Sequence, residues 1–166
     1  LRTYLSTLYW KIIEKALDHG LYVVVRPPGV CPGGIKVNGY YQDYLLKVWD
    51  IVSSNTNIKE HSGQVSIELA NEPVNIYDAD SLESVRAPYD FFQPIVDKIR
   101  ANGFDGIIWV PGTGWQSNYV CYKNNPIEGY NIGYAVHAYV GWYNNNDENA
   151  DGETFIKEFG KAVPVV

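Results

Sequence analysis

Residues 67–73 read Ile67-Glu68-Leu69-Ala70-Asn71-Glu72-Pro73. They close an apolar run, Val65–Leu69, that predicts a buried β-strand, and Pro73 ends it because proline has no backbone N–H for a neighbouring strand. Glu72 is therefore expected to be held at the tip of a strand rather than on a mobile loop. Catalytic carboxylates occupy this place in barrels of parallel strands. A solvated glutamate before a turn is the alternative interpretation of this motif alone.

Strand patterns alternate with helix patterns along the chain. Residues 3–19 place apolar side chains at helical spacing, and Gly20 follows as a stop signal. Further helices are expected at Tyr41–Val52, at about 88–101 (with a kink or a later start at Pro94) and at about Glu153–Phe159. Strands are expected at Leu21–Val25, Val65–Leu69, Ile107–Val110, Tyr134–Val140 and Val163–Val166. The alternation implies βαβ units and a parallel sheet of the α/β class. The polar stretches between these elements are expected to be loops.

Three segments, taken together, resemble glycoside hydrolase family 5 and its clan of retaining β-glycanases. The Asn-Glu-Pro of residues 71–73 resembles the family's signature at the end of its fourth strand. Residues 109–115, Trp-Val-Pro-Gly-Thr-Gly-Trp, resemble its fifth strand and loop, and residues 136–139, Val-His-Ala-Tyr, resemble the His-x-Tyr of its sixth strand. The order and spacing of the three segments also agree. The resemblance implies a partial TIM (β/α)8 barrel, with about strands three to seven of eight and their helices.

The length of the chain is small for that fold. A chain of 166 residues is long enough for one domain with a core, but a complete barrel of this type takes about 250 residues. There is no methionine, the chain opens within a helical pattern, and it stops inside the apolar run 163–166. We therefore expect residues 1–166 to be a single-domain internal fragment of a larger catalytic domain.

The resemblance also assigns catalytic roles. A retaining glycosidase needs two carboxyl groups about 5–5.5 Å apart, one as general acid/base and one as nucleophile. Glu72 matches the acid/base, which needs a pKa raised by partial burial and by the second carboxylate. Asn71 matches the residue that bonds the sugar 2-OH and the nucleophile, although a turn-forming asparagine is the local alternative. His137 matches a contact to the sugar and Tyr139 a contact to the nucleophile, and two residues apart on one strand they would share a face.

Two other glutamates are candidates for the second carboxylate. Glu68 and Glu72 would be about 13 Å apart along a straight strand, which is too far, so Glu68 is expected to be buried in the barrel with a cationic partner. Glu158 lies in Lys-Glu-Phe-Gly, which resembles the family's nucleophile motif, but the pattern there is that of a helix end. The nucleophile is therefore expected just beyond Val166, and this fragment alone is expected to lack turnover.

Aromatic residues make up 14% of the chain, with fourteen Tyr, five Trp and five Phe. Most are expected to fill core and strand positions. Trp115, Trp142 and Tyr143, however, lie in loops rich in Gly and Asn, where their faces can stack on sugar rings; the alternative is that they pack on the barrel rim. The family commonly carries a His-bearing segment where this chain has Arg26-Pro27-Pro28-Gly29-Val30. Arg26 is expected to serve as a cationic partner in the cleft or in a buried salt bridge.

Charge and cysteine content exclude several classes of function. The formal net charge is −6 without a basic stripe, which argues against nucleic-acid binding, and no apolar run approaches the roughly 20 residues of a membrane helix. Cys31 and Cys121 sit in loops, and the sequence leaves open whether they are bridged or free. No zinc-type spacing accompanies them, and the glycosidase chemistry requires no metal or organic cofactor.

The resemblance predicts a cellulase-like, retaining endo-β-1,4-glycanase that acts on a β-glucan or related polysaccharide, and it implies secretion. Two alternatives stay open: a non-catalytic carbohydrate-binding barrel, and a barrel enzyme of unrelated chemistry with Glu72 as a general base. An incomplete barrel would expose two strand edges, so self-association through these edges is also predicted.

Overall fold

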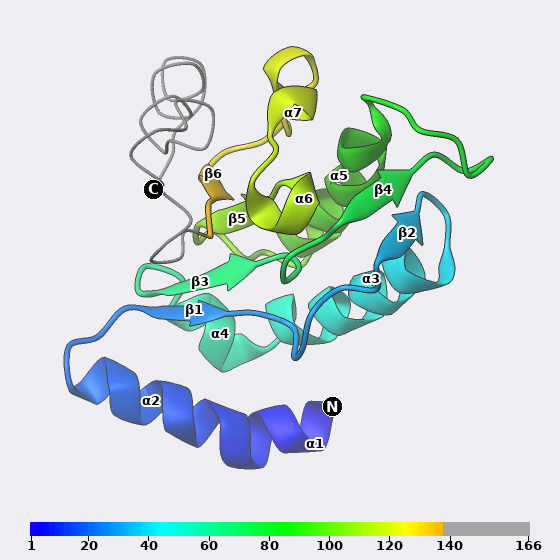
Figure 1. The fold of residues 1–166 in the computed structure, drawn as a ribbon. Helices are drawn as coiled ribbons and strands as arrows, with labels where there is room; N and C mark the ends of the chain where they lie inside the picture. The colour runs from blue at the N-terminus through cyan, green and yellow to red at the C-terminus, as the bar shows by residue number, and fades with distance from the viewer. Residues whose placement is uncertain (138–166) are drawn as a thin grey trace.

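Four parallel strands form the central sheet, in the order β1–β3–β5–β6 (Figure 1). The computed structural model describes residues 1–137. Each pair of neighbours in this sheet is parallel. The strands are β1 (Val23–Val25), β3 (Val65–Glu68), β5 (Ile108–Pro111) and β6 (Ile132–Ala135). The predicted parallel α/β architecture is therefore confirmed for this part of the chain.

Helices connect the successive strands of the central sheet, as βαβ units require. The first predicted helix is present but contains a π-helical turn. Glycines with positive φ follow two helices: Gly20 at +75° and Gly103 at +82°. Glycine takes this conformation without a side-chain penalty, so both predicted helix ends are explained. The helices are α1 (Arg2–Tyr4), η1 (Leu5–Tyr9), α2 (Trp10–Asp18), α3 (Tyr40–Ser53), α4 (Thr56–Glu60), α5 (Ala87–Ala101), α6 (Thr113–Gln116) and α7 (Val120–Asn124).

The stretches predicted as loops contain a second, two-stranded parallel sheet. It pairs β2 (Gly34–Lys36) with β4 (Asn75–Tyr77). Strands of three residues are too short to show a period in the sequence. The expectation of loops was therefore wrong at these two places.

Pro94 lies inside α5 without ending it. Proline cannot donate to the carbonyl four residues earlier, which leaves the carbonyl of Asp90 without its helical donor. The side-chain amide of Gln42, on α3, donates to that carbonyl at 3.1 Å and to the carbonyl of Phe91 at 2.7 Å. The neighbouring helix thus compensates for the proline, and α5 begins at Ala87, before Pro94.

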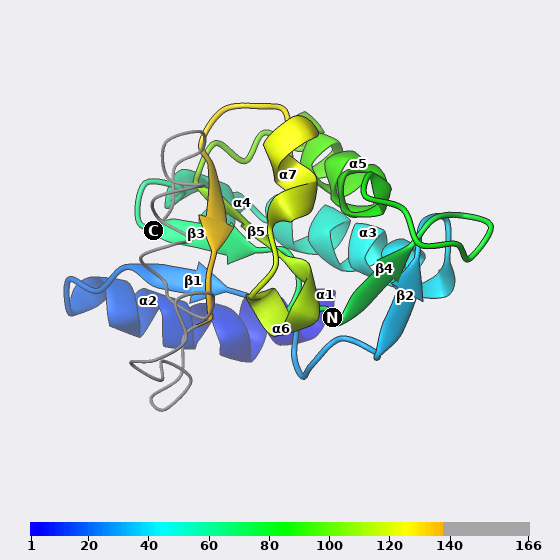
Figure 2. The ribbon, with the colours of Figure 1, turned by 45° about the horizontal axis from the view of Figure 1, so that its top comes forward.

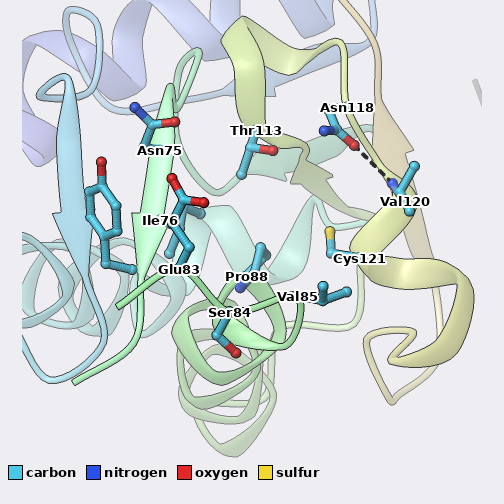
Figure 3. A pocket seen from close by; sticks show the side chains of 11 residues that line it. Asn75, Ile76, Glu83, Ser84, Val85, Pro88, Thr113, Asn118, Val120 and Cys121 are labelled. Carbon is cyan, nitrogen blue, oxygen red and sulfur yellow. Dashed lines mark hydrogen bonds between the residues drawn. The ribbon is translucent and has the colours of Figure 1, made fainter. Parts of the chain in front are cut away.

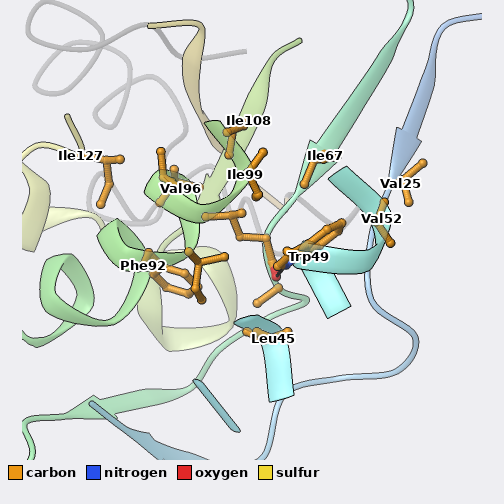
Figure 4. Close-up of a cluster of buried hydrophobic side chains, with 14 of the residues drawn as sticks. Val25, Leu45, Trp49, Val52, Ile67, Phe92, Val96, Ile99, Ile108 and Ile127 are labelled. Carbon is orange, nitrogen blue, oxygen red and sulfur yellow. Dashed lines mark hydrogen bonds between the residues drawn. The ribbon is translucent and has the colours of Figure 1, made fainter. Parts of the chain in front are cut away.

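Apolar side chains from the sheet, α3 and α5 form one core (Figure 4). Trp49 on α3 and Phe92 on α5 are fully buried there, together with Ile67 and Ile108 from adjacent strands. Burial of a large apolar side chain stabilises the fold by about 1.5–3 kcal/mol. This core fixes β3 and β5, and therefore fixes the loops that follow their carboxyl ends.

Several predictions fall on other parts of the chain or need correction. β6 spans Ile132–Ala135, so the strand predicted over Tyr134–Val140 starts earlier and does not include residues 136 and 137, whereas residues 138–140 lie outside the described part of the chain. The helix and strand predicted at 153–159 and 163–166, together with Tyr139, Trp142, Tyr143 and Glu158, lie outside the described residues. Within residues 1–137, no helix is both long enough and apolar enough to span a bilayer.

Candidate active site

The chain leaving β3 is held by bonds from three directions. The indole N–H of Trp49 donates to the Leu69 carbonyl at 2.9 Å, and the Leu69 N–H donates to the Trp109 carbonyl of β5 at 3.0 Å. The Cys31 N–H then donates to the Asn71 carbonyl at 2.9 Å. Residues 69–71 are buried. The backbone that carries Asn71 and Glu72 is therefore fixed although β3 has already ended.

Asn71 receives a hydrogen bond from Arg26. The Arg26 Nη1 donates to the Asn71 Oδ1 at 2.6 Å, and Asn71 is only 9% exposed. Since the guanidinium can only donate, it fixes which side of the amide is oxygen and turns the amide NH2 the other way. Arg26 is thus a cationic partner next to the candidate site. Among the described residues it forms no salt bridge, and the salt-bridge alternative stays a prediction because the acidic residues of 138–166 lie outside the described part of the chain.

Glu72 adopts a left-handed backbone conformation with φ of 53°. Such a conformation costs a residue with a side chain on the order of 1–3 kcal/mol and persists only where neighbours hold it. The Glu72 N–H donates to the Oε1 of Gln116 at 2.8 Å. Glu72 therefore lies in a sharp bend four residues past the end of β3, whereas the prediction placed it at the tip of the strand.

Gln116 connects three parts of the site, and the sequence analysis missed it. Its side chain is fully buried and accepts from the Glu72 N–H, while its Nε2 donates to Glu68 at 3.1 Å and to the Ala135 carbonyl at 3.0 Å. Its loop is also joined to the Glu72 loop, because the backbone N–H groups of Gly114 and Trp115 donate to the carbonyls at positions 74 and 73. Figure 2 shows the resulting position of α6 near the carboxyl end of β3.

His137 lies between two carboxylates. Its Nδ1 is 3.0 Å from the Oε1 of Glu72, and its Nε2 is 3.1 Å from the Oε1 of Glu68. The side chains are 19% exposed for His137, 16% for Glu72 and 8% for Glu68. The structure thus brings Glu72, Asn71 and His137 together at the carboxyl ends of the strands, on the side where barrel active sites lie.

The straight-strand spacing estimated between Glu68 and Glu72 was wrong. Only one imidazole ring separates the two carboxylates, because the chain bends after Leu69 and Glu72 turns back. Glu68 is buried inside the barrel as expected. Among the described residues, its partners are His137, which is a cation only when it is protonated, and the side-chain amide of Gln116.

Tyr119 supports the same corner of the site. Its hydroxyl donates to the Ala135 carbonyl and lies 3.3 Å from the Gln116 carbonyl. Burial raises the pKa of Tyr119 well above its usual range, so the phenol stays neutral and donates. It fixes the chain two residues before His137.

Trp115 is about half exposed, at 51%, in the loop that carries Gln116. Its φ is 56°, so the loop turns sharply here and leaves the indole in solvent next to the Glu72 bend. This position suits the predicted stacking contact with a sugar ring. The stacking role of Trp115 stays a prediction.

A cavity of about 490 Å³ adjoins this loop (Figure 3). Thr113 and Asn118 line it on one side, and Asn75 and Glu83 line it on the other. Neither Glu72 nor His137 is among its lining residues. The cavity is therefore separate from the two carboxylates and is not the place of the candidate chemistry.

Neither cysteine is bridged. Cys31 and Cys121 are both free and buried, and burial raises the pKa of each thiol, to about 12 for Cys121. In residues 1–137, no group of three or more His, Cys, Asp or Glu is arranged to hold a metal ion. The question that the sequence left open is thereby answered for the cysteines.

Comparison with known proteins identifies the family. The model of the cellulase family (glycosyl hydrolase family 5) matches residues 4–163. An endoglucanase of Bacillus sp. (strain KSM-635) is 30% identical over 146 residues, which is 81% of this chain but 14% of that protein. Endoglucanase E-5 of Thermobifida fusca is 28% identical over 164 residues, 90% of this chain and 32% of that protein. The chain thus spans a third or less of these relatives.

Solved structures show the same fold. The catalytic domain of a Thermobifida fusca endoglucanase superposes with a TM-score of 0.71 at 23% identity, over 99% of this chain and 50% of that one. A second structure of that domain, a variant in complex with cellotetraose, has a TM-score of 0.70 at 23% identity, with the same coverage of both chains. This likeness confirms the predicted partial TIM barrel. With a family model matched over nearly its whole length, the chain belongs to the cellulases of glycosyl hydrolase family 5.

Proposed function

We propose that this chain is part of a retaining endo-β-1,4-glycanase that hydrolyses a β-glucan, with Glu72 as its general acid/base. One observation carries the proposal: the Glu72 carboxylate is fixed, only partly exposed and hydrogen-bonded to His137 at the carboxyl ends of parallel strands. Membership of the cellulase family supplies the reaction class. A solvated glutamate before a turn would have neither the bond nor the burial.

Glu72 acts twice in this chemistry. In the first step its carboxyl O–H gives a proton to the glycosidic oxygen as the bond to the sugar's anomeric carbon breaks. In the second step the resulting carboxylate takes a proton from the water that attacks the glycosyl-enzyme intermediate. The hydrogen bond that the Glu72 backbone N–H donates to Gln116 Oε1 holds the bend that carries the carboxyl group during both steps.

Asn71 presents its amide NH2 to the substrate. Because Arg26 occupies the Asn71 oxygen, the NH2 is the group that faces away from Arg26 and can donate to an acceptor. A sugar hydroxyl oxygen and an ionised carboxylate are both suitable acceptors. This agrees with the role that the family resemblance assigns, a bond to the 2-OH and to the nucleophile.

The nucleophile is not among the carboxylates described at the site. Glu68 is 8% exposed and receives bonds from Gln116 and His137, so it has no path to an anomeric carbon. We propose that the nucleophile is a glutamate just beyond Val166, that Tyr139 has the role that the family resemblance assigns to it, a hydrogen bond to the nucleophile, and that residues 1–166 alone do not turn over. Trp115, Trp142 and Tyr143 are proposed to bind the glucan chain, and secretion follows only from the family resemblance.

The test uses purified residues 1–166 and a longer chain that includes the segment after Val166. We expect the longer chain to release reducing sugar from a soluble β-glucan, its Glu72→Gln variant to lose about 10²–10⁴-fold of that rate, and residues 1–166 to release none. A matched Glu128→Gln variant of the longer chain should keep its rate. Binding of the glucan by the longer chain without cleavage would favour the carbohydrate-binding alternative and reject the proposal.

A further inference from the structure

The imidazole of His137 contacts a different carboxylate with each nitrogen. Nδ1 faces Glu72 at 3.0 Å and Nε2 faces Glu68 at 3.1 Å. An ionised carboxylate can only accept, whereas a protonated one can also donate. The two contacts therefore determine where protons reside on the ring.

Glu68 already accepts a hydrogen bond on the oxygen that faces His137. Gln116 Nε2 donates to the same Oε1 that His137 Nε2 contacts, and the carboxylate is 8% exposed. An acceptor in this position keeps a hydrogen on His137 Nε2. The Glu72 contact is different, because a carboxyl group that acts as acid and then as base must gain and lose a proton.

We propose that Glu68 is a positioning residue for the catalytic acid: by holding a proton on His137 Nε2, it leaves Nδ1 as the nitrogen that exchanges a proton with Glu72. This inference rests on the proposed function, since it assigns a device that prepares Glu72 for its two steps. The exchange is balanced, because the proton that leaves Nδ1 arrives on the Glu72 carboxylate. The ring loses one positive charge as the carboxylate loses one negative charge.

The two other histidines have the opposite arrangement. Nδ1 of His19 lies 2.7 Å from the Lys15 carbonyl, and Nδ1 of His61 lies 2.9 Å from the Asn57 carbonyl. A carbonyl only accepts, so Nδ1 carries the hydrogen in these neutral rings. They are internal references for His137 in the same sample.

Few other charged or titratable groups of residues 1–137 face this cluster. Tyr119 bonds the Ala135 carbonyl and is neutral, because burial raises its pKa. Arg26 is bonded to Asn71. Among the hydrogen bonds and ion pairs described for the His137 ring, only Glu68 and Glu72 are partners.

Nitrogen-15 NMR of the full chain with labelled histidine tests the proposal without any need for turnover. At about pH 8, above the usual titration range of histidine, we expect the His137 Nε2 to show the shift of a protonated nitrogen. His19 and His61 should show a bare Nε2 and a protonated Nδ1. A bare Nε2 on His137 in the unmodified protein would overturn the proposal.

Variants of Glu68 distinguish its role as a hydrogen-bond acceptor for His137 from a role in packing alone. Glu68→Gln keeps an acceptor oxygen and should keep the Nε2–H, whereas Glu68→Met fills similar space without an acceptor and should lose it. Glu14→Met, at an exposed position of α2, is the matched control and should leave the spectrum unchanged. An unchanged His137 spectrum in Glu68→Met would overturn the proposal, and the unmodified protein still decides if that variant does not fold. A protonated His137 Nε2 together with no glucan hydrolysis by the longer chain that includes the segment after Val166 would reject the proposed function alone.

Discussion

Replacing Gln116 by methionine should destabilise the protein and disturb the Glu72–His137 contact together. Methionine has nearly the same volume, so the change removes hydrogen bonds without a large cavity. Gln116 is fully buried and forms bonds of 2.8, 3.1 and 3.0 Å to Glu72, Glu68 and Ala135. The effect should therefore report on hydrogen bonding in the site.

The size of the stability loss depends on which hydrogen bonds the partners of Gln116 keep in the variant. Glu68 retains the bond to His137, and the Ala135 carbonyl retains the bond from Tyr119. The principal loss is the bond that holds the strained backbone of Glu72. Loss of a bond to a buried polar group costs about 1–3 kcal/mol, so we expect a loss of about 2 kcal/mol in the free energy of unfolding. This corresponds to a fall in Tm of about 4–8 °C for a chain of this size.

Urea denaturation followed by circular dichroism measures the free energy, and the His137 ring signals report on the site. Gln93→Met is the matched control, because Gln93 is 9% exposed and bonds Asp97 and both backbone groups of Glu128 on the other side of α5. Both variants should lose similar stability, but only Gln116→Met should shift the His137 signals. A cost below about 0.5 kcal/mol, or equal His137 shifts in both variants, would refute the reasoning.

Three further outcomes are expected. Trp115→Ala should weaken binding of a soluble β-glucan about tenfold, as expected for loss of one stacking face. The control Tyr40→Ala, at an exposed position of α3, should not weaken it. Equal affinities of the Trp115→Ala variant and the unmodified protein by calorimetry would contradict this. Burial raises the pKa of the Cys31 and Cys121 thiols, so iodoacetamide should label the native protein slowly at pH 8. Labelling should become faster as rising pH forms thiolate, and it should be rapid after unfolding. Rapid labelling of the native protein at pH 8 would be inconsistent with the burial. Sedimentation should show concentration-dependent self-association through the β1 edge. Val24→Lys should weaken this self-association because an edge lysine opposes strand pairing. If the unmodified chain is a monomer at all concentrations, self-association is excluded.

The sequence was sufficient to predict the strand before Glu72 and the helices around it. Val65–Leu69 is a continuous apolar run between polar segments, and such runs mark strands that are buried on both faces. Gly20 and Gly103 marked two helix ends for a local steric reason. These features depend on neighbours in the chain, which a single sequence displays.

The contacts that hold the site depend on residues far apart in the chain. Gln116 lies 44 residues from Glu72 and 48 from Glu68, and its type and surroundings give no local sign of this role. The bend that brings Glu72 back toward Glu68 depends on the same bond, which is why a straight-strand estimate failed. The end of β6 before His137 was missed because the apolar run continues past the last paired residue.

The central claim is that Glu72 supplies and removes the proton. It is tested most directly by comparing two substrates in a longer chain that carries Glu72→Ala. A β-glucan needs a proton on its leaving oxygen, whereas a dinitrophenyl cellobioside releases a stable phenolate that needs none. We predict that β-glucan cleavage falls by about 10²–10⁴-fold while the first, phenolate-releasing step keeps nearly its original rate. An equal loss with both substrates, or no loss with β-glucan, would contradict the account.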